Sequence, residues 1–361
     1  MEDIQQYNFT VKSNIHDYKV NFIDSVKETL ATELKEGDFI IIDNKVKSLY
    51  PEWFEDALEN FNYIGIEASE LQKSYQEVEP VINTLIENDF RKNHRLIAIG
   101  GGITQDVTAF IASVLYRGVQ WCFFPTTLLA QGDSCIGSKT SINFGKFKNQ
   151  VGGFYPPNTI YVDPKFLESL PYKELQSGLG EMAHYFVVAG EEDFERYKRD
   201  YPQALKDKDI LRGVIARSLE IKKSYIEIDE YDKHKRQVFN YGHSFGHAIE
   251  SLSAYKIPHG IAVSFGMDMS NYVSMKKGYI TSETRQNSRE LFEKIWEGYA
   301  DRVKVLDIDT YLNALSKDKK NKGPLLGLIL KKGYGKVFKD FTENDEVFRE
   351  WMIEYFTNEL N

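Results

Sequence analysis

The chain has 361 residues, of which 42% are hydrophobic and 27% charged. These are ordinary values for a globular protein with room for two domains. The formal net charge is −9 and acidic and basic residues are interspersed, which argues against a nucleic-acid partner, because a phosphate backbone requires a basic surface.

Short apolar runs alternate with helical patterns in the first half of the chain. Residues 38–43 and 95–100 are typical of buried strands, and the second run ends in glycines. A helical pattern follows at 107–116, and two further strands are expected at 121–125 and 159–163. This alternation predicts a parallel sheet covered by helices.

The second half has few β-branched runs. Helical spacing covers residues 174–188, 204–225 and 285–299. We therefore expect a Rossmann-like α/β nucleotide-binding domain over residues 1–168 and an all-α domain over residues 169–361.

The two cysteines and the N-terminus indicate the compartment. Cys122 and Cys135 lie in apolar or small-residue surroundings without metal-binding spacing, as expected of buried free thiols in a reducing compartment. The first residues lack the basic region followed by an apolar run that marks a signal peptide. No stretch approaches the roughly 20 apolar residues that span a bilayer. We expect a cytoplasmic protein with no membrane partner.

A glycine-rich segment, 100–106, directly follows a predicted strand and precedes a predicted helix. Glycines there let the main chain approach a pyrophosphate, and the start of a helix supplies free N–H donors. The segment is not G-x-G-x-x-G, and a tight turn would use glycines too. Thr126 and Thr127 follow the next strand, at the end of a sheet where nucleotides bind. Asp43, which ends the first strand, is placed to accept from a ribose hydroxyl.

Four histidines stand in patterns that suit a metal site. His243 and His247 are four residues apart, so one helix face can carry both. His259 lies in Pro-His-Gly, and His184 follows Glu181 in Glu-x-x-His spacing. Imidazole and carboxylate together suit zinc or a similar divalent ion. Spacing alone leaves open whether His243 and His247 are paired ligands or structural residues.

Several basic residues are candidates for binding an anionic substrate. Singly, each is most simply a solvated surface residue. If several converged, they would form a pocket for a doubly anionic substrate, in which arginine grips a planar carboxylate. The residues concerned are Arg117, Lys139, Lys146, Lys148, Lys222, Arg236, Lys319 and Lys320, of which Lys146 lies outside the residues that the structure describes.

Taken together, these motifs resemble those of 3-dehydroquinate synthases and the wider sugar-phosphate cyclases, from about Asp43 to about Lys320. The resemblance implies a dehydroquinate synthase-like fold, a homodimer, bound NAD and one divalent ion, Zn²⁺ or Co²⁺. The matching motifs are Gly-Gly-Gly-x-x-x-Asp at 100–106, Arg-Gly at 117–118, Pro-Thr-Thr-Leu-Leu-Ala at 125–130, Asp-Ser-x-x-Gly-x-Lys-Thr at 133–140, Lys-Asn-x-x-Gly-x-Phe at 148–154, Gly-His-x-x-Gly-His-Ala at 242–248 and Pro-His-Gly at 258–260.

Matched residue by residue, the resemblance implies Glu181, His243 and His259 as metal ligands, with His247 at the substrate phosphate instead. Lys222 and Arg236 match positions that grip the substrate carboxylate. The remaining implied substrate contacts are Lys139, Asn149, Asn240 and Lys319 or Lys320 for phosphate and hydroxyls, Asp133 for a ring hydroxyl, and Arg117 for the phosphate in a neighbouring subunit.

The resemblance also implies the residues that hold NAD. The segment Ser69-Glu-Leu-Gln-Lys-Ser74 matches a Gly-Glu-x-x-Lys-Ser motif. The implied NAD-binding residues are Asp43, Asn44, Glu70, Lys73, Gly101, Gly102, Asp106, Thr126, Thr127, Lys148, Phe166 and Ser169.

The implied activity is that of the shikimate pathway: 3-deoxy-arabino-heptulosonate 7-phosphate is cyclised to 3-dehydroquinate and phosphate by NAD-cycled oxidation, elimination, reduction and intramolecular aldol closure. One departure bears on it, because His184 replaces a lysine that usually touches the substrate hydroxyls, and Ser138 replaces a usual glycine. Three alternatives stay open: a paralogous cyclase acting on an amino, deoxy or heptulose phosphate, a metal-dependent polyol dehydrogenase of the iron-alcohol-dehydrogenase type, and a binding protein without catalysis.

Overall fold

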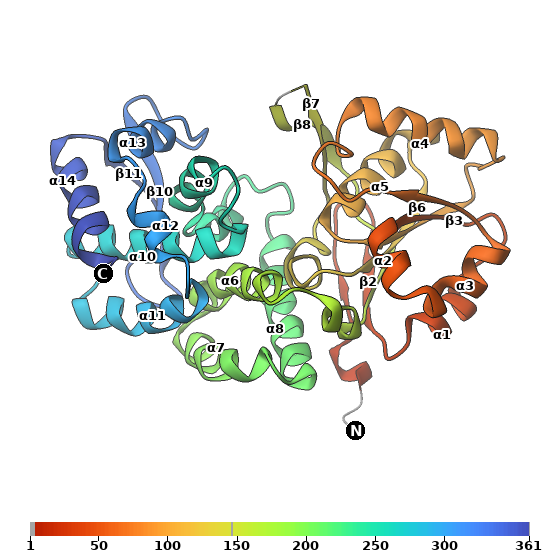
Figure 1. Cartoon of the computed structure of the whole chain (residues 1–361), viewed down its shortest axis with the longest axis horizontal. Coiled ribbons are helices and arrows are strands. Elements are labelled where there is room, and N and C mark those ends of the chain that lie inside the picture. Colours follow the sequence, from red (N-terminus) through yellow and green to blue (C-terminus); the bar gives the residue numbers. More distant parts are fainter. Residues whose placement is uncertain (1–3, 146, 361) are drawn as a thin grey trace. The chain divides into compact units, whose positions relative to one another are not determined.

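The computed structural model describes residues 4–145 and 147–360. The chain forms two compact units (Figure 1). The N-terminal unit comprises Met1–Leu170 and Leu211–Asp232, and the C-terminal unit comprises Pro171–Ile210 and Lys233–Asn361. The first break lies close to the predicted boundary after residue 168, but no sequence pattern indicated that residues 211–232 group with the N-terminal unit. The predicted division into domains of residues 1–168 and 169–361 stays a prediction.

A seven-stranded sheet forms the centre of the described N-terminal unit, and every neighbouring pair except β1 and β2 is parallel. The strand order is β1-β2-β9-β6-β5-β3-β4. The four predicted strands are confirmed to within one residue at each end. The strands are β1 (Phe9–Val11), β2 (Tyr18–Phe22), β3 (Phe39–Asp43), β4 (Asn62–Ile66), β5 (Arg95–Gly100), β6 (Gln120–Pro125) and β9 (Thr159–Val162).

The predicted strands are the central ones because parallel strands buried on both faces read as continuous apolar runs. Ile40, Ile42, Ile97 and Ile99 are buried in one core cluster. The strands absent from the prediction, β1, β2 and β4, lie toward the edges of the sheet, where exposed residues interrupt the apolar pattern.

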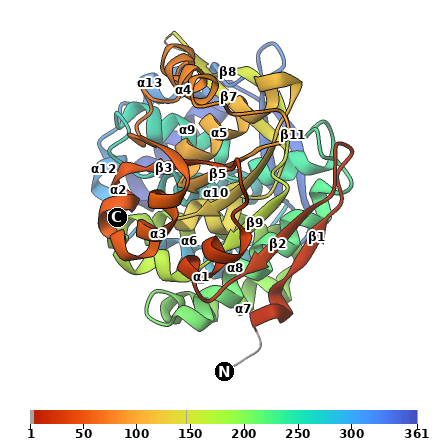
Figure 2. The ribbon, with the colours of Figure 1, turned by 90° about the vertical axis from the view of Figure 1, so that its right-hand side faces the viewer.

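Helices pack around this sheet (Figure 2). The helix predicted at 107–116 begins earlier, at Gly102, and ends at Val114, where Tyr116 and Arg117 take left-handed φ angles of 50° and 63°. An antiparallel hairpin of β7 (Lys139–Phe144) and β8 (Phe147–Phe154) also belongs to this unit. The helices are α1 (Val26–Glu33), α2 (Asn44–Leu49), α3 (Pro51–Asn60), α4 (Tyr75–Glu87), α5 (Gly102–Val114) and the larger part of α8 (Lys208–Ile226).

The C-terminal unit is mainly helical, as predicted, with one addition: strands β10 (Leu325–Lys331) and β11 (Val337–Glu343) pair antiparallel. Helix α10 is buried from Gly260 to Ser274, and it packs against α6, α9 and α11. The helices are α6 (Tyr172–Ala189), α7 (Glu191–Ala204), α9 (His243–Leu252), α10 (His259–Lys276), α11 (Ser282–Ile295), α12 (Ala300–Lys304), α13 (Ile308–Ser316) and α14 (Glu346–Glu354).

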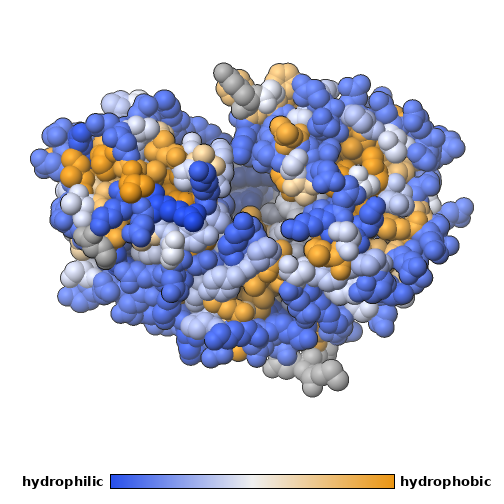
Figure 3. Space-filling model, in the orientation of Figure 1, coloured by the Kyte–Doolittle hydropathy of each residue, from blue (hydrophilic) through white to orange (hydrophobic). Residues whose placement is uncertain are grey.

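Polar residues are spread over the surface and along the helices of the described part of the chain. Hydrophilic residues surround separate apolar patches on the face drawn in Figure 3. Across the described residues, every helix is too short or too polar to cross a bilayer.

Candidate metal and nucleotide sites

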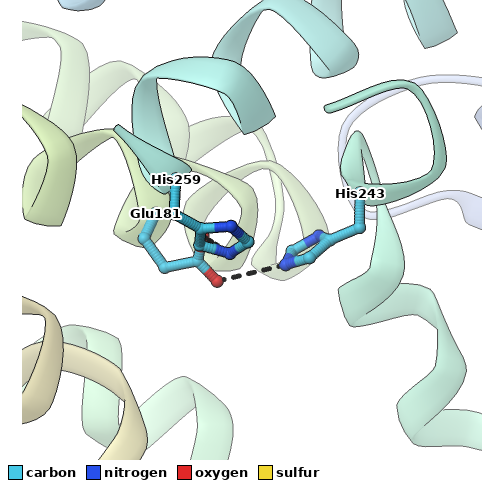
Figure 4. A group of neighbouring side chains, drawn as sticks. All are labelled: Glu181, His243 and His259. Atoms are coloured by element: carbon cyan, nitrogen blue, oxygen red, sulfur yellow. Dashed lines mark hydrogen bonds and ion pairs between the residues drawn. The ribbon is translucent and has the colours of Figure 1, made fainter. Parts of the chain in front are cut away.

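Three potential metal ligands meet inside the C-terminal unit. Glu181 lies in the middle of α6, His243 is the first residue of α9, and His259 is the first residue of α10 (Figure 4). The Nε2 atom of His243 lies 3.2 Å from Oε1 of Glu181, and the Nε2 atom of His259 lies 3.4 Å from Oε2. One ligand atom from each residue falls within 4.8 Å of the other two. The structure thus brings together the set that the resemblance implies.

Both imidazoles turn the same nitrogen toward Glu181, because their other nitrogens are engaged. The Nδ1 atom of His243 lies 3.3 Å from the carbonyl of Tyr241, and the Nδ1 atom of His259 lies 3.1 Å from Oε2 of Glu250. Each Nδ1–H is therefore placed to donate, which leaves the Nε2 lone pair for an ion. Two imidazole nitrogens and a carboxylate suit zinc or a similar divalent ion, with a further position open to substrate.

Glu181 is almost completely buried, at 3% exposure. Burial alone raises the pKa of this carboxyl, but the imidazoles of His243 and His259 outweigh it and hold the pKa well below its ordinary value. The site is therefore built around a buried anion, the electrostatic setting in which a divalent cation is favoured.

Glycines let the three ligand-bearing helices approach closely. A Cβ atom added to Gly260, next to His259, would lie 1.8 Å from the carbonyl oxygen of Ser177 on α6. A Cβ added to Gly266 would lie 1.9 Å from the carbonyl oxygen of Gly242, which precedes α9. Only glycine fits at either contact, so α10 packs main chain against main chain on both neighbours.

His184, at the position where a lysine is usual, follows Glu181 on α6. Its Nδ1 atom lies 3.8 Å from Oε1 of Glu181, and the side chain is buried, with its ring centroid 3.9 Å from that of Tyr185 and 5.6 Å from that of Phe239. The imidazole is thus a buried neighbour of the carboxylate, and it lies outside the group of three.

The other predicted residues of the C-terminal unit lie on or near α9. His247, Glu250 and His259 form a second group of potential ligands, and neither group contains both His243 and His247. The ring centroids of His243 and His247 lie 5.5 Å apart, so the pairing that spacing left open stays a prediction, and the geometry favours the group of Glu181, His243 and His259. The remaining implied substrate residues of this unit are Arg236, Asn240, Lys319 and Lys320. Arg236 is buried, and the side-chain amide of Asn240 donates to the carbonyl of Gln237. Lys319 is exposed, and the Nζ atom of Lys320 lies 2.7 Å from Asp318.

In the N-terminal unit, the sheet has the geometry of a nucleotide site at the ends of β3 and β5. From β3 the chain goes to β4 on one side, whereas β5 lies on the other side of β3. Ligands of open α/β sheets bind at such a reversal, outside the carboxyl ends of the strands. Asp43 ends β3 and Gly100 ends β5.

The glycine loop leaves the start of α5 open. Gly101 caps this 13-residue helix, and a Cβ added to Gly102 would meet no described atom within 4 Å. Thr127 packs against Gly101, and the amide of Thr126 donates to the carbonyl of Gly100 at 2.9 Å. The hydroxyl of Thr126 is buried without a hydrogen-bond partner among the described atoms. Free N–H groups, an open approach and this hydroxyl fit a nucleotide phosphate.

Four of the implied NAD residues form one network. The ammonium of Lys73 lies 2.5 Å from Oδ2 of Asp106, where burial raises the pKa of the carboxyl and Lys73 opposes the rise. Asn143 donates its side-chain amide to Glu70 at 2.7 Å and its main-chain N–H to the carbonyl of Lys73 at 2.7 Å. Lys148 lies 3.8 Å from Glu70. Sequence reasoning missed Asn143, although it ends the Lys-Thr-Ser-Ile-Asn run that carries Lys139.

The other implied NAD residues have structural partners. Asp43 caps α2 by accepting from the amide of Lys45, and burial raises its pKa. Asn44 donates to Glu67 at 2.8 Å. The Phe166 side chain is 1% exposed and packs in the core. Its main-chain N–H donates to the carbonyl of Asp163, and its carbonyl accepts from the hydroxyls of Tyr50 and Ser169.

The implied substrate residues of the N-terminal unit either pair with acidic side chains or have a left-handed main-chain conformation. The ammonium of Lys222 is buried and donates to Oδ1 and to the carbonyl of Asp133, both at 2.7 Å. Lys139 pairs with Asp232 at 2.5 Å, a partner that sequence reasoning missed. Arg117, Asn149 and Asp232 have φ angles of 63°, 54° and 58°, a left-handed conformation that is uncommon outside glycine and often marks functional positions.

Comparison with known proteins finds similarity along most of the chain. Residues 63–177 match the model of the 3-dehydroquinate synthase N-terminal domain, and residues 178–321 match that of the C-terminal domain. The 3-dehydroquinate synthase of Clostridium tetani is 34% identical over 296 residues, 81% of this chain and 79% of that protein. A bifunctional 3-dehydroquinate synthase/phosphatase of Fusobacterium nucleatum is 31% identical over 324 residues, and the chain spans 48% of its length.

Solved structures of the same fold include two cyclases. A 2-deoxy-scyllo-inosose synthase complexed with carbaglucose-6-phosphate, NAD⁺ and Co²⁺ has a TM-score of 0.82 at 21% identity, covering 97% of this chain and 99% of that one. A 2-epi-5-epi-valiolone synthase from Streptomyces hygroscopicus, with NAD⁺ and Zn²⁺ bound, has a TM-score of 0.82 at 22% identity, covering 95% and 97%. At these identities the likeness concerns the fold.

Proposed function

The chain belongs to the 3-dehydroquinate synthase family, and we propose that it converts 3-deoxy-arabino-heptulosonate 7-phosphate to 3-dehydroquinate and phosphate, with NAD and a divalent ion, Zn²⁺ or Co²⁺, as cofactors. The observation that carries the proposal is that His243 and His259 lie beside the buried carboxylate of Glu181. Relatives of this name that match over four fifths of the chain support it.

The residues present fit both cofactors. Glu181, His243 and His259 would hold the ion, and Gly101, Gly102 and the threonines after β6 would receive the phosphates of NAD. When bound, the two cofactors supply reversible hydride transfer and polarisation of the alcohol that is oxidised.

We propose that basic side chains of the chain bind the carboxylate and the phosphate of the substrate. Lys222 and Arg236 are both buried, at 6% and 7% exposure, and we assign them to the carboxylate. Because Asp133 already orients the ammonium of Lys222, little reorganisation is needed when the carboxylate arrives. We assign the phosphate and the remaining hydroxyls to Lys139, Asn149, Asn240, His247 and Lys320, and, from a second subunit of a homodimer, Arg117.

The test is phosphate release from 3-deoxy-arabino-heptulosonate 7-phosphate by the purified chain with NAD⁺ and Zn²⁺ or Co²⁺, with a chelator-treated sample as control. The proposal expects chelator-sensitive release without accumulation of NADH, because the hydride returns to the substrate. Steady NADH accumulation would instead indicate a dehydrogenase. Absence of release from intact protein that binds NAD would refute the assigned substrate.

His184 favours a second candidate, a paralogous cyclase with a different sugar phosphate. An imidazole buried against Glu181 is shorter than the usual lysine and reaches less far toward substrate hydroxyls. Comparing wild type with His184→Lys across amino, deoxy and heptulose phosphates tests this candidate. If the substitution changes no relative rate, His184 does not set specificity.

A further inference from the structure

We infer that Glu250 is a positioning residue that fixes the tautomer and orientation of His259 for the divalent ion, a role that rests on the proposed function. The Oε2 atom of Glu250 lies 3.1 Å from Nδ1 of His259, while Nε2 of the same ring lies 3.4 Å from Glu181. The two ring nitrogens therefore face two different carboxylates, only one of which belongs to the group of three.

The turn between α9 and α10 builds this contact. Ala254 and Tyr255 take left-handed φ angles of 50° and 59°, and the amide of Tyr255 donates to the carbonyl of Glu250 at 2.9 Å. Pro258 then caps α10, so that His259 begins this helix beside the last turn of α9. The nine-residue separation between Glu250 and His259 is thus closed by the local fold.

A carboxylate at this place has a defined effect on the ring. By accepting from Nδ1–H it holds the tautomer whose lone pair is on Nε2, and its charge increases the basicity of that nitrogen. His243 has a neutral counterpart, since its Nδ1 faces the carbonyl of Tyr241. Loss of such an outer partner typically lowers metal affinity roughly 10–100-fold.

The same carboxylate also belongs to a second group of potential ligands, formed by His247, Glu250 and His259. If the ion were held by that group, Glu250 and His247 would both be direct ligands. Removal of His247 separates the two roles, since it leaves the Glu250–His259 contact in place.

The experiment measures Zn²⁺ and Co²⁺ affinity of the full chain by competition with a chromophoric chelator, together with the visible spectrum of the Co²⁺ form. The variants are Glu250→Ala, Glu250→Gln and His247→Ala, and the matched control is Glu350→Ala, at an exposed position of α14. Glu250→Ala should lose roughly 10–100-fold in affinity and alter the Co²⁺ spectrum. Glu250→Gln, whose amide oxygen still accepts, should recover part of the loss.

His247→Ala and Glu350→Ala should bind the metal as wild type does. The inference is overturned if Glu250→Ala binds within about twofold of wild type, or if His247→Ala loses as much affinity as Glu250→Ala. Glu250→Gln keeps the shape of the side chain and decides the matter should the alanine variant fail to fold. Wild-type protein that is folded but binds neither ion would overturn the proposed function as well, which distinguishes the two failures.

Discussion

Replacing Gly260 by alanine should disrupt the metal group through the main chain. The added Cβ would lie 1.8 Å from the carbonyl oxygen of Ser177 and 2.7 Å from the amide nitrogen of Glu181. An ordinary carbon–oxygen contact is about 3.3 Å or more, so α10 must retreat from α6 by about 1.5 Å. Metal–ligand distances tolerate only about 0.2 Å. Because His259 adjoins Gly260, the shift exceeds this tolerance several-fold.

We expect Gly260→Ala to lower zinc affinity by at least the roughly 10–100-fold typical of a lost outer contact. Overpacking should also destabilise the fold by about 1–3 kcal/mol or more, which lowers Tm by about 2–4 °C per kcal/mol. Chelator competition measures the affinity, and thermal unfolding with and without Zn²⁺ measures the stability. The stabilisation that Zn²⁺ gives wild type should be largely absent from the variant.

Gly213→Ala is the matched control. Gly213 lies within α8, and a Cβ added there meets no described atom within 4 Å. This substitution should leave zinc affinity unchanged and raise stability by about 0.4–1 kcal/mol, through the lower entropy of the unfolded chain. If Gly260→Ala binds zinc and unfolds as wild type does, the close approach of α10 and α6 does not position the ligands.

Three further outcomes are expected. Lys73→Met leaves Asp106 without its cation, so it should weaken NAD⁺ binding in calorimetry. In denaturant unfolding it should lower the free energy of unfolding by about 2–3 kcal/mol, less than the roughly 3–5 kcal/mol lost when a fully buried pair is broken. Unchanged values would contradict the network. Burial raises the pKa of Cys122 to about 11 and of Cys135 to about 12, so mass spectrometry after iodoacetamide treatment at pH 8 should find both unmodified until the protein unfolds. Burial lowers the pKa of Lys331 to about 7 from 10.5; the folded state then binds fewer protons than the unfolded state, so stability relative to Lys331→Met should rise from pH 7 to 9, and a flat difference would refute the shift.

Local patterns in the sequence specify the central strands, the glycine turn and the candidate metal ligands of this protein. Continuous apolar runs specified the buried central strands, and the glycines after residue 99 marked the turn at the start of α5. The sequence also indicates the ligand types, since Glu181 lies in Glu-x-x-His spacing and His243, His247 and His259 lie in two motifs that contain glycine. Both signals depend on neighbours in the chain, where periodicity and turn chemistry operate.

Spacing could not decide which of these side chains meet. His243 and His247 share a helix and suggest a pair, yet the structure joins His243 to Glu181, 62 residues earlier, and to His259. Asn143, Asp232 and Glu250 lie outside every motif used, and each contacts a residue that a motif marked.

Contacts between residues far apart in the chain arise only on folding, because they depend on how closely the helices pack. At Gly260 and Gly266 the main chain of α10 approaches its neighbours more closely than any side chain would allow. A glycine in the sequence signals that freedom without naming its partner. The partner is set by the packing of α6, α9 and α10 as a whole, and that packing places two imidazoles around one buried carboxylate.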